Sequence, residues 1–367
     1  MTDREKLLSG EIINPQTISE NISLTELLDR TFLSYNAGRL REACQIYTRK
    51  MLQENVTIGI SLAGALTPAG LGSSCLVPLM EKGFIDWIVA TGANLYHDIH
   101  FALGLKLMQG KPYFDDSLLK QEGVVRIYDI VFDYQVLLKT DDFLKNVFSN
   151  EEFQKDMGTA EVHYLLGKYL NQEEEKRETK GRSILASAYR LAIPVYSPSP
   201  GDSSIGMNVA ALALTGNRLK LDVNLDVNET AAIVYNAKQD GGKSGVIIIG
   251  GGSPKNFLLQ TEPQIQEVLG LSETGHDYFI QITDARPDTG GLSGATPSEA
   301  ISWGKVNPEG LPDTVVAYLD STIALPIITA YSLNKSTARD QKGLYEKRAG
   351  LLETLKKDYL EKTIDLT

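Results

Sequence analysis

The sequence predicts a single α/β domain with one doubly wound, mostly parallel, Rossmann-like sheet that carries helices on both faces. Two observations predict it. Short apolar runs recur along the chain, and helical stretches lie between most of them. Strands that alternate with helices need crossover connections, which give parallel strands covered on both faces. No linker, repeat or low-complexity tract is visible, so we expect residues 1–367 to form one domain.

The expected strands are short apolar runs typical of buried β-structure. They cover residues 56–62, 86–91, 194–197, 245–249, 277–283 and 315–319. The helices expected between them cover residues 66–81, 182–192, 229–239 and 256–269.

A helical extension is expected over about residues 1–55. Ser23 and Glu26 have the spacing of a capping box, which predicts a helix start at this point. Apolar residues then recur at helical intervals as far as Met51. Gly38 is expected to divide this segment into two helices.

A charged amphipathic helix is expected at the other end, over about residues 338–363. Its apolar side consists of Leu344, Leu351, Leu355 and Leu360. We expect it to pack on the body of the protein or on another subunit. A charged run at residues 173–180 is expected to be a solvated loop or helix end.

Composition excludes several classes of function. The net charge of -11 opposes binding to a phosphate backbone, so no nucleic-acid partner is expected, and its sign suits polycationic substrates. No apolar run approaches the roughly 20 residues that span a bilayer, and the N-terminus lacks the apolar core of a signal peptide. We expect a cytoplasmic protein without a membrane segment.

Metal binding by the protein is not expected. The two cysteines, Cys44 and Cys75, are too few for a zinc cluster and are expected to be buried free thiols. The four histidines have no metal-ligand spacing; they are His97, His100, His163 and His276.

Five loops rich in Gly, Ser, Thr and Asp favour a bound nucleotide. They follow expected strands, at residues 63–70, 91–94, 199–204, 250–253 and 284–294. Ligands of open parallel sheets bind beyond the carboxyl ends of the strands, and small residues let backbone N–H groups approach a phosphate. There is no GxGxxG fingerprint, and any single loop of this kind could equally be a tight turn. The five together indicate a nucleotide.

The segment 290–305 is the most informative of the chain. Thr296 or Ser298 can cap a short helix with Pro297 in its first turn. That helix is expected to end near Gly304, directly before Lys305.

Lys305 is the candidate nucleophile. Glu299 and Trp303 are four residues apart and share a helix face, so Trp303 offers a π face and Glu299 a counter-charge to an alkylammonium. A lysine in apolar company loses its proton more readily and can attack a carbonyl or an imine. An isolated lysine is ordinarily a surface residue, so these residues alone give a weak indication.

The segment Ser298-Glu-Ala-Ile-Ser-Trp-Gly-Lys305 closely resembles the active-site segment of deoxyhypusine synthase, whose lysine forms a covalent imine. Three further segments resemble family segments in the same order: Ile193-Pro-Val-Tyr-Ser-Pro198 with Gly201-Asp202, Ile247-Ile-Ile-Gly-Gly-Gly252 with Pro254-Lys255, and Val316-Ala-Tyr-Leu-Asp320. The likeness covers roughly residues 40–335. The lysine segment is specific to this family and its homospermidine synthase relatives.

The resemblance implies an NAD-dependent transferase of aminobutyl groups from spermidine or putrescine, assembled as a homotetramer with active sites at subunit interfaces. Lys305 would be catalytic, with Glu299 and Trp303 in the substrate site. The residues implied to bind NAD are Gly64, Ala65, Thr91, Gly92, Ala93, Asp202, Gly251, Asp284, Ala285, Asp320 and Ser321.

Several substrate positions depart from the eukaryotic pattern. Asn256 replaces a histidine, Met207 and Leu292 replace acidic polyamine contacts, and His97 replaces another acidic residue. These departures resemble the bacterial deoxyhypusine synthase-like branch. They favour a small acceptor such as putrescine, which would give homospermidine. Two alternatives are deoxyhypusine formation on a lysine of a translation initiation factor, and a catalytically reduced protein that binds NAD or polyamine.

Overall fold

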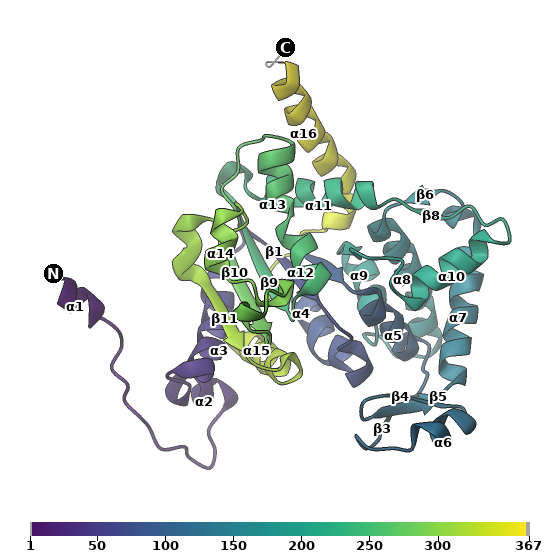
Figure 1. Cartoon of the computed structure of the whole chain (residues 1–367), viewed down its shortest axis with the longest axis horizontal. Helices are drawn as coiled ribbons and strands as arrows, with labels where there is room; N and C mark the ends of the chain where they lie inside the picture. The colour runs from purple at the N-terminus through teal and green to yellow at the C-terminus, as the bar shows by residue number, and fades with distance from the viewer. Residues whose placement is uncertain (1, 365–367) are drawn as a thin grey trace.

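A six-stranded parallel sheet organises the computed structural model, which describes residues 2–364 (Figure 1). The strand order is β11-β10-β9-β1-β2-β7, so the chain winds outward in both directions from β1, as the sequence predicted. The strands are β1 (Val56–Leu62), β2 (Trp87–Ala90), β7 (Val195–Tyr196), β9 (Lys243–Ile249), β10 (Tyr278–Thr283) and β11 (Thr314–Tyr318). Each lies within about two residues of an expected strand.

The sheet is buried on both faces, which explains why its strands are continuous apolar runs. Alternate residues of β9 belong to two different core clusters, Ile247 and Ile249 to one and Val246 and Ile248 to the other. The first face is covered by α3 (Tyr35–Ile46), α4 (Val77–Glu81), α5 (Gly92–Ala102), α9 (Ile184–Leu191) and α15 (Ser321–Lys335). The second is covered by α11 (Val223–Ala237), α12 (Gly252–Leu259) and α16 (Leu344–Ile364).

A mostly helical region between β2 and β7 was not predicted. Its helices are α6 (Asp116–Gln121), α7 (Gln135–Phe148), α8 (Thr159–Lys176) and the short η4 (Glu151–Phe153). An antiparallel sheet is formed by β3 (Met108–Gln109), β5 (Ile130–Asp133) and β4 (Val124–Ile127), and β6 (Asp156–Met157) pairs with β8 (Lys220–Leu221). Helix α10 (Ser204–Ala213) packs against α7 and α5. Strands of two to four residues carry too little alternation to be recognised in a sequence.

Several expected helices are divided into short pieces. Residues 66–81 form η2 (Thr67–Ala69), the π-helical η3 (Gly72–Leu76) and α4, because Gly70 adopts a left-handed conformation. After α12 come α13 (Thr261–Pro263) and the π-helical η6 (Gln264–Val268). The remaining short helices are η5 (Gln239–Gly241), η7 (Pro287–Thr289), η8 (Leu292–Gly294), α14 (Pro297–Ser302) and η9 (Pro308–Asp313).

The N-terminal helices differ from expectation at one point. The capping box of Ser23 and Glu26 starts α2 (Leu24–Thr31), as predicted, and a short α1 (Asp3–Leu7) precedes it. The break after α2 falls before α3 rather than at Gly38, so the prediction for Gly38 was wrong. Gly38 lies inside α3, which continues as the π-helical η1 (Tyr47–Met51), and a Cβ there would lie 3.3 Å from the Leu33 carbonyl carbon. The glycine permits close packing instead of ending the helix.

Two other predictions need correction. The charged run does form the end of α8, but Glu174 within it is buried, where it accepts from two backbone N–H groups and pairs with Arg190. The final helix begins at Leu344, six residues after the expected start, because Arg339 is buried against Asp86 and residues 338–343 form no helix. Leu344 and Leu355 are buried, as expected.

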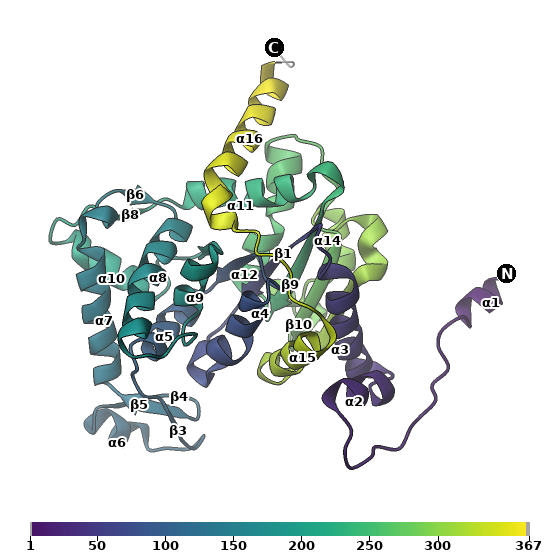
Figure 2. The ribbon, with the colours of Figure 1, turned by 180° about the vertical axis from the view of Figure 1, so that it is seen from behind.

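The last part of α16 projects away from the body (Figures 1 and 2). Leu360 on this part is 48% exposed and does not pack on the body, so its packing against another subunit stays a prediction. Cys44 and Cys75 are buried free thiols, as expected. No helix within residues 2–364 combines the length and apolar composition of a membrane crossing.

Candidate functional site

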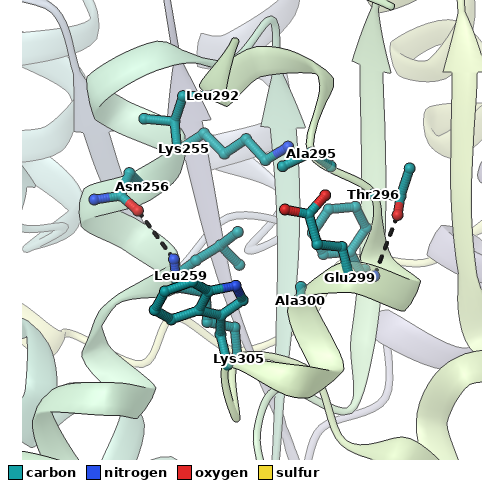
Figure 3. Close-up of a pocket in the computed structure, with 11 residues that line it drawn as sticks. Lys255, Asn256, Leu259, Leu292, Ala295, Thr296, Glu299, Ala300 and Lys305 are labelled. Atoms are coloured by element: carbon teal, nitrogen blue, oxygen red, sulfur yellow. Dashed lines mark hydrogen bonds between the residues drawn. The ribbon is translucent and has the colours of Figure 1, made fainter. Parts of the chain in front are cut away.

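A cavity of about 330 Å³ lies between α12 and α14, over the face of the sheet beside Phe279 of β10 (Figure 3). It contains the sequence-predicted nucleophile and four of the six residues predicted to bind substrate. Its lining residues are Lys255, Asn256, Leu259, Phe279, Leu292, Ala295, Thr296, Glu299, Ala300, Trp303 and Lys305.

The local sequence fixes the helix that carries the nucleophile. Thr296 caps α14 by accepting from the Glu299 N–H at 3.2 Å, and Pro297 occupies the first turn, as predicted. The helix ends in a Schellman motif, in which Gly304 adopts a φ of 66° and the Lys305 N–H donates to the Ala300 carbonyl at 3.0 Å. This ending directs both Trp303 and Lys305 to the cavity.

A glutamine outside the cavity supports the same turn. The Gln266 side-chain amide donates to the Gly304 carbonyl at 2.8 Å, and its oxygen would be 2.5 Å from any Cβ at position 304. Sequence reasoning missed Gln266, which lies in the π-helical η6 far from the motif in sequence. It helps to hold the backbone of Lys305 in one conformation.

Lys305 is half-buried in the cavity wall. Its Nζ donates to Asn256 Oδ1 at 3.0 Å and lies 5.7 Å from the centroid of the Trp303 ring. Burial lowers the pKa of Lys305, and the carboxylate of Glu299 partly opposes this shift. The neutral, nucleophilic amine is therefore more accessible here than on an exposed lysine.

A second lysine of the cavity was missed as a site residue. Lys255 is buried, and its Nζ donates to Gln281 Oε1 at 2.9 Å and to the Ala295 carbonyl at 2.6 Å. Burial lowers the pKa of Lys255 to about 8, and nearby Lys305 lowers it further while Glu299 opposes the shift. The sequence feature that could have identified Lys255 is its position directly before Asn256. Its contacts hold the loop before α14 against the sheet.

Few carboxylates are available in the cavity to pair with a cationic substrate. Glu299 is the one carboxylate among its lining residues, facing Asn256 across the cavity (Figure 3). Leu292 and Trp303 supply apolar surface and are 45% and 58% exposed. One carboxylate beside apolar walls suits a short alkyl chain that ends in a single ammonium.

Two predicted substrate residues lie elsewhere in the chain. Met207 is exposed on α10, and His97 lies on α5, where its Nδ1 is 3.1 Å from His100 Nε2. Neither lines the cavity, and both helices lie apart from α14 (Figure 1). Burial lowers the pKa of His97, so its ring favours the neutral form. A single chain does not bring these two residues to Lys305.

The residues predicted to bind NAD follow the strands at their carboxyl ends. Gly64 and Ala65 follow β1, Thr91, Gly92 and Ala93 follow β2, and Asp202 follows β7. Gly251 follows β9, Asp284 and Ala285 follow β10, and Asp320 and Ser321 follow β11. The topology therefore gathers all six groups at one edge of the sheet.

The loops at this edge fit a dinucleotide. A Cβ at Gly92 would lie 2.3 Å from Ser203 Oγ and one at Gly251 2.4 Å from Ser293 Cα, so both glycines let neighbouring loops close together. Gly64 has a φ of +60° and no atom within 4 Å of its would-be Cβ, so its backbone is open to a ligand. These are the properties that close approach of a pyrophosphate requires.

Asn94 orders the first of these loops and was missed. Its side-chain NH2 donates to the Gly64 carbonyl at 3.1 Å, and its Oδ1 accepts from the Leu66 N–H at 2.7 Å. The Thr91 hydroxyl also donates to the Gly64 carbonyl, at 2.6 Å.

Within residues 2–364, no group of three or more His, Cys, Asp or Glu side chains could hold a metal ion.

Comparison with known proteins gives a consistent result. The family profile described as deoxyhypusine synthase matches residues 24–332. A "Deoxyhypusine synthase-like protein" of Nostoc punctiforme is 60% identical over 351 residues, covering 96% of this chain and 90% of the relative. A "Probable deoxyhypusine synthase 2" of Methanosarcina acetivorans is 39% identical over 319 residues, covering 87% and 88%.

One solved structure shares the fold. It is described as a "putative deoxyhypusine synthase" from Entamoeba histolytica, and it superimposes with a TM-score of 0.58 over 90% of this chain and 99% of that one. The sequence identity of 15% restricts this likeness to the fold.

Proposed function

Because this chain belongs to the deoxyhypusine synthase family, whose members are NAD-dependent transferases, we propose that it moves a 4-aminobutyl group from a polyamine to an acceptor amine. Lys305 carries the aminobutyl group from the donor to the acceptor. The observation that carries the proposal is the placement of the Lys305 amine in the cavity, between Asn256 and Trp303, with a pKa lowered by burial.

The chemistry of Lys305 is an exchange of imines. Its neutral Nζ attacks the carbon of the oxidised donor, and a new C–N bond forms while the C=N bond becomes single. The bond from that carbon to the leaving amine then breaks, and the leaving amine takes up a proton. The aminobutyl chain remains as an imine on Nζ. An acceptor amine reverses these steps and frees Lys305.

The cavity holds the chain during this exchange. The Glu299 carboxylate pairs with the terminal ammonium of the aminobutyl group, and the Trp303 ring lies along its methylene groups. Leu292 and Trp303 would exclude water, which otherwise hydrolyses the imine, once another subunit covers them.

The loops at the sheet edge are proposed to hold NAD. Gly64 gives backbone access to its phosphates, Gly92 and Gly251 let the neighbouring loops close together, and the exposed carboxylates of Asp284 and Asp320 can accept from ribose hydroxyls. When bound, NAD accepts a hydride from the donor carbon and returns it to the product, so that redox nets to zero.

The proposed acceptor is a small amine such as putrescine, which gives homospermidine. A cavity of about 330 Å³ with one lining carboxylate suits a short chain with one free ammonium. A triamine acceptor would bring one more charge than putrescine to a cavity with one lining carboxylate.

The proposed assembly is a homotetramer with active sites at subunit interfaces. Large apolar side chains are exposed on the chain, among them Trp303, Leu292 and Ile323, and Met207 is exposed on α10. Such residues favour burial against another subunit. An interface of this kind could also bring Met207 and His97 of one subunit to Lys305 of another.

Incubation of the purified protein with NAD and a panel of amines, followed by mass spectrometry of the products, tests the function. We expect aminobutyl transfer between small amines and none with Lys305→Arg, since arginine stays protonated and cannot attack. Lys342→Arg is the matched control, because burial also lowers the pKa of Lys342, outside the cavity. Transfer only to a protein lysine would redirect the proposal, and no transfer to any acceptor would overturn it.

A further inference from the structure

Asn256 on α12 and Gln260, the residue that caps the end of α12, form a short hydrogen-bonded chain that ends at the nucleophile. Asn256 Oδ1 accepts from Lys305 Nζ at 3.0 Å, and Asn256 Nδ2 donates to Gln260 Oε1 at 2.9 Å. Residues four apart lie on the same face of a helix, so Gln260 is positioned to reach the Asn256 amide. Gln260 itself does not line the cavity.

The direction of this chain is determined by what each atom can do. A protonated lysine only donates, so the Asn256 oxygen must face it, and the Asn256 amino group must then face Gln260. A flipped Asn256 amide would place two donors together at Lys305 and two oxygens together at Gln260. Both hydrogen bonds would be lost, so the observed orientation is strongly preferred.

We infer that Asn256 positions Lys305 rather than binding substrate, and that Gln260 keeps the Asn256 amide in the orientation that this requires. The inference rests on the proposed function, in which Lys305 is the nucleophile. It changes the role of Asn256, which the sequence resemblance places among the substrate contacts.

The consequence concerns the lone pair of neutral Lys305. One N–H of the amine remains on Asn256 Oδ1, and the Trp303 ring flanks the same Nζ. The lone pair must point away from the donated N–H, towards the rest of the cavity, where Glu299 lies opposite Asn256 (Figure 3). The carbon under attack lies in that direction when the terminal ammonium pairs with Glu299.

The alternative role as a substrate contact fits less well. A substrate ammonium needs an acceptor, and one of the two lone pairs on the Asn256 oxygen already receives the Lys305 N–H, so at most one remains for the substrate. Glu299 is the carboxylate that lines the cavity and serves an ammonium better.

Variants of Gln260 test the inference. Gln260→Glu keeps an oxygen that accepts from Asn256, whereas Gln260→Leu removes the acceptor at similar size. We expect Gln260→Leu to slow adduct formation on Lys305 by about tenfold with the donor KM unchanged, and Gln260→Glu to stay within about twofold of wild type. Gln239→Leu, at an exposed glutamine on η5, is the control. Equal slowing by both Gln260 variants would overturn the inference.

Variants of Asn256 test the same inference independently. Asn256→Ala should lower the rate of adduct formation, not raise the donor KM; a raised KM with an unchanged rate would show a substrate contact and overturn the inference. Circular dichroism and NAD binding check that each variant is folded.

A donor-independent measurement separates this inference from the proposed function. Labelling of Lys305 by trinitrobenzenesulfonate, followed across pH, reports its pKa without any polyamine. Asn256→Ala should move the profile to lower pH because an acceptor for the ammonium is lost, and Asn256→Asp should move it to higher pH. If wild type forms no adduct, the proposed function fails; if these profiles coincide with wild type, the positioning role fails.

Discussion

Replacement of Leu292 by Asp should change which polyamine the protein prefers as donor. Leu292 lines the cavity that contains Lys305, where Glu299 is the one carboxylate among the lining residues. A second carboxylate could pair with the additional charge of spermidine, which putrescine lacks once its other amine is consumed. A hydrogen bond to a charged group contributes about 1.5–3 kcal/mol, or roughly one to two decades in binding.

The expected gain in binding must be reduced because Leu292 is 45% exposed and solvent screens a charge at this position. We therefore expect Leu292→Asp to raise the ratio of kcat/KM for spermidine over putrescine by about tenfold, the lower end of that range. The ratio is the useful quantity, since an added carboxylate also raises the pKa of Lys305 and slows both donors alike.

The assay is steady-state kinetics with each donor under the same acceptor and NAD concentrations. Leu118→Asp on α6 is the matched control, because Leu118 is 52% exposed, does not line the cavity, and receives the same charge. An unchanged ratio, or an equal rise in both variants, would show that the structure assigns Leu292 to the wrong part of the substrate site.

Three further predictions follow from the contacts. Arg339→Met leaves a buried carboxylate unpaired and should cost about 3–5 kcal/mol in the free energy of unfolding measured by denaturant titration. Arg126→Met breaks a solvent-screened pair and should have a much smaller effect on the same quantity; similar costs would contradict this. Glu299→Gln should move the labelling profile of Lys305 to lower pH, because the Glu299 carboxylate raises the pKa of Lys305 and a neutral glutamine does not. A shift of the profile to higher pH would contradict this effect of Glu299. Trp303→Leu removes the ring that is proposed to lie along the methylene groups of the donor and should raise the donor KM; an unchanged KM would exclude Trp303 from the substrate site.

The parallel sheet could be predicted because its strands are buried on both faces and stand out as apolar runs. The edge that gathers the small-residue loops follows from the same topology, since parallel strands all end on one side. The geometry of Thr296, Gly304 and Lys305 was also predictable, because capping residues act within one or two turns.

Other features depend on contacts that are distant in the sequence. Arg339 makes hydrogen bonds to the carbonyls of Gly83, Gln53 and Val56, and no local pattern reveals that its charge is buried. Gln266 supports Gly304 from 38 residues away for the same reason. The short strands β3 to β5 were missed because two to four residues show no reliable alternation.

Covalent trapping tests the central claim most directly. The protein is incubated with NAD and a donor amine, reduced with borohydride, digested and mapped by tandem mass spectrometry. The account predicts a reduced aminobutyl group on Lys305, which requires NAD and is lost in Lys305→Arg. An adduct on another lysine, such as buried Lys255, or no adduct with any polyamine, would contradict it.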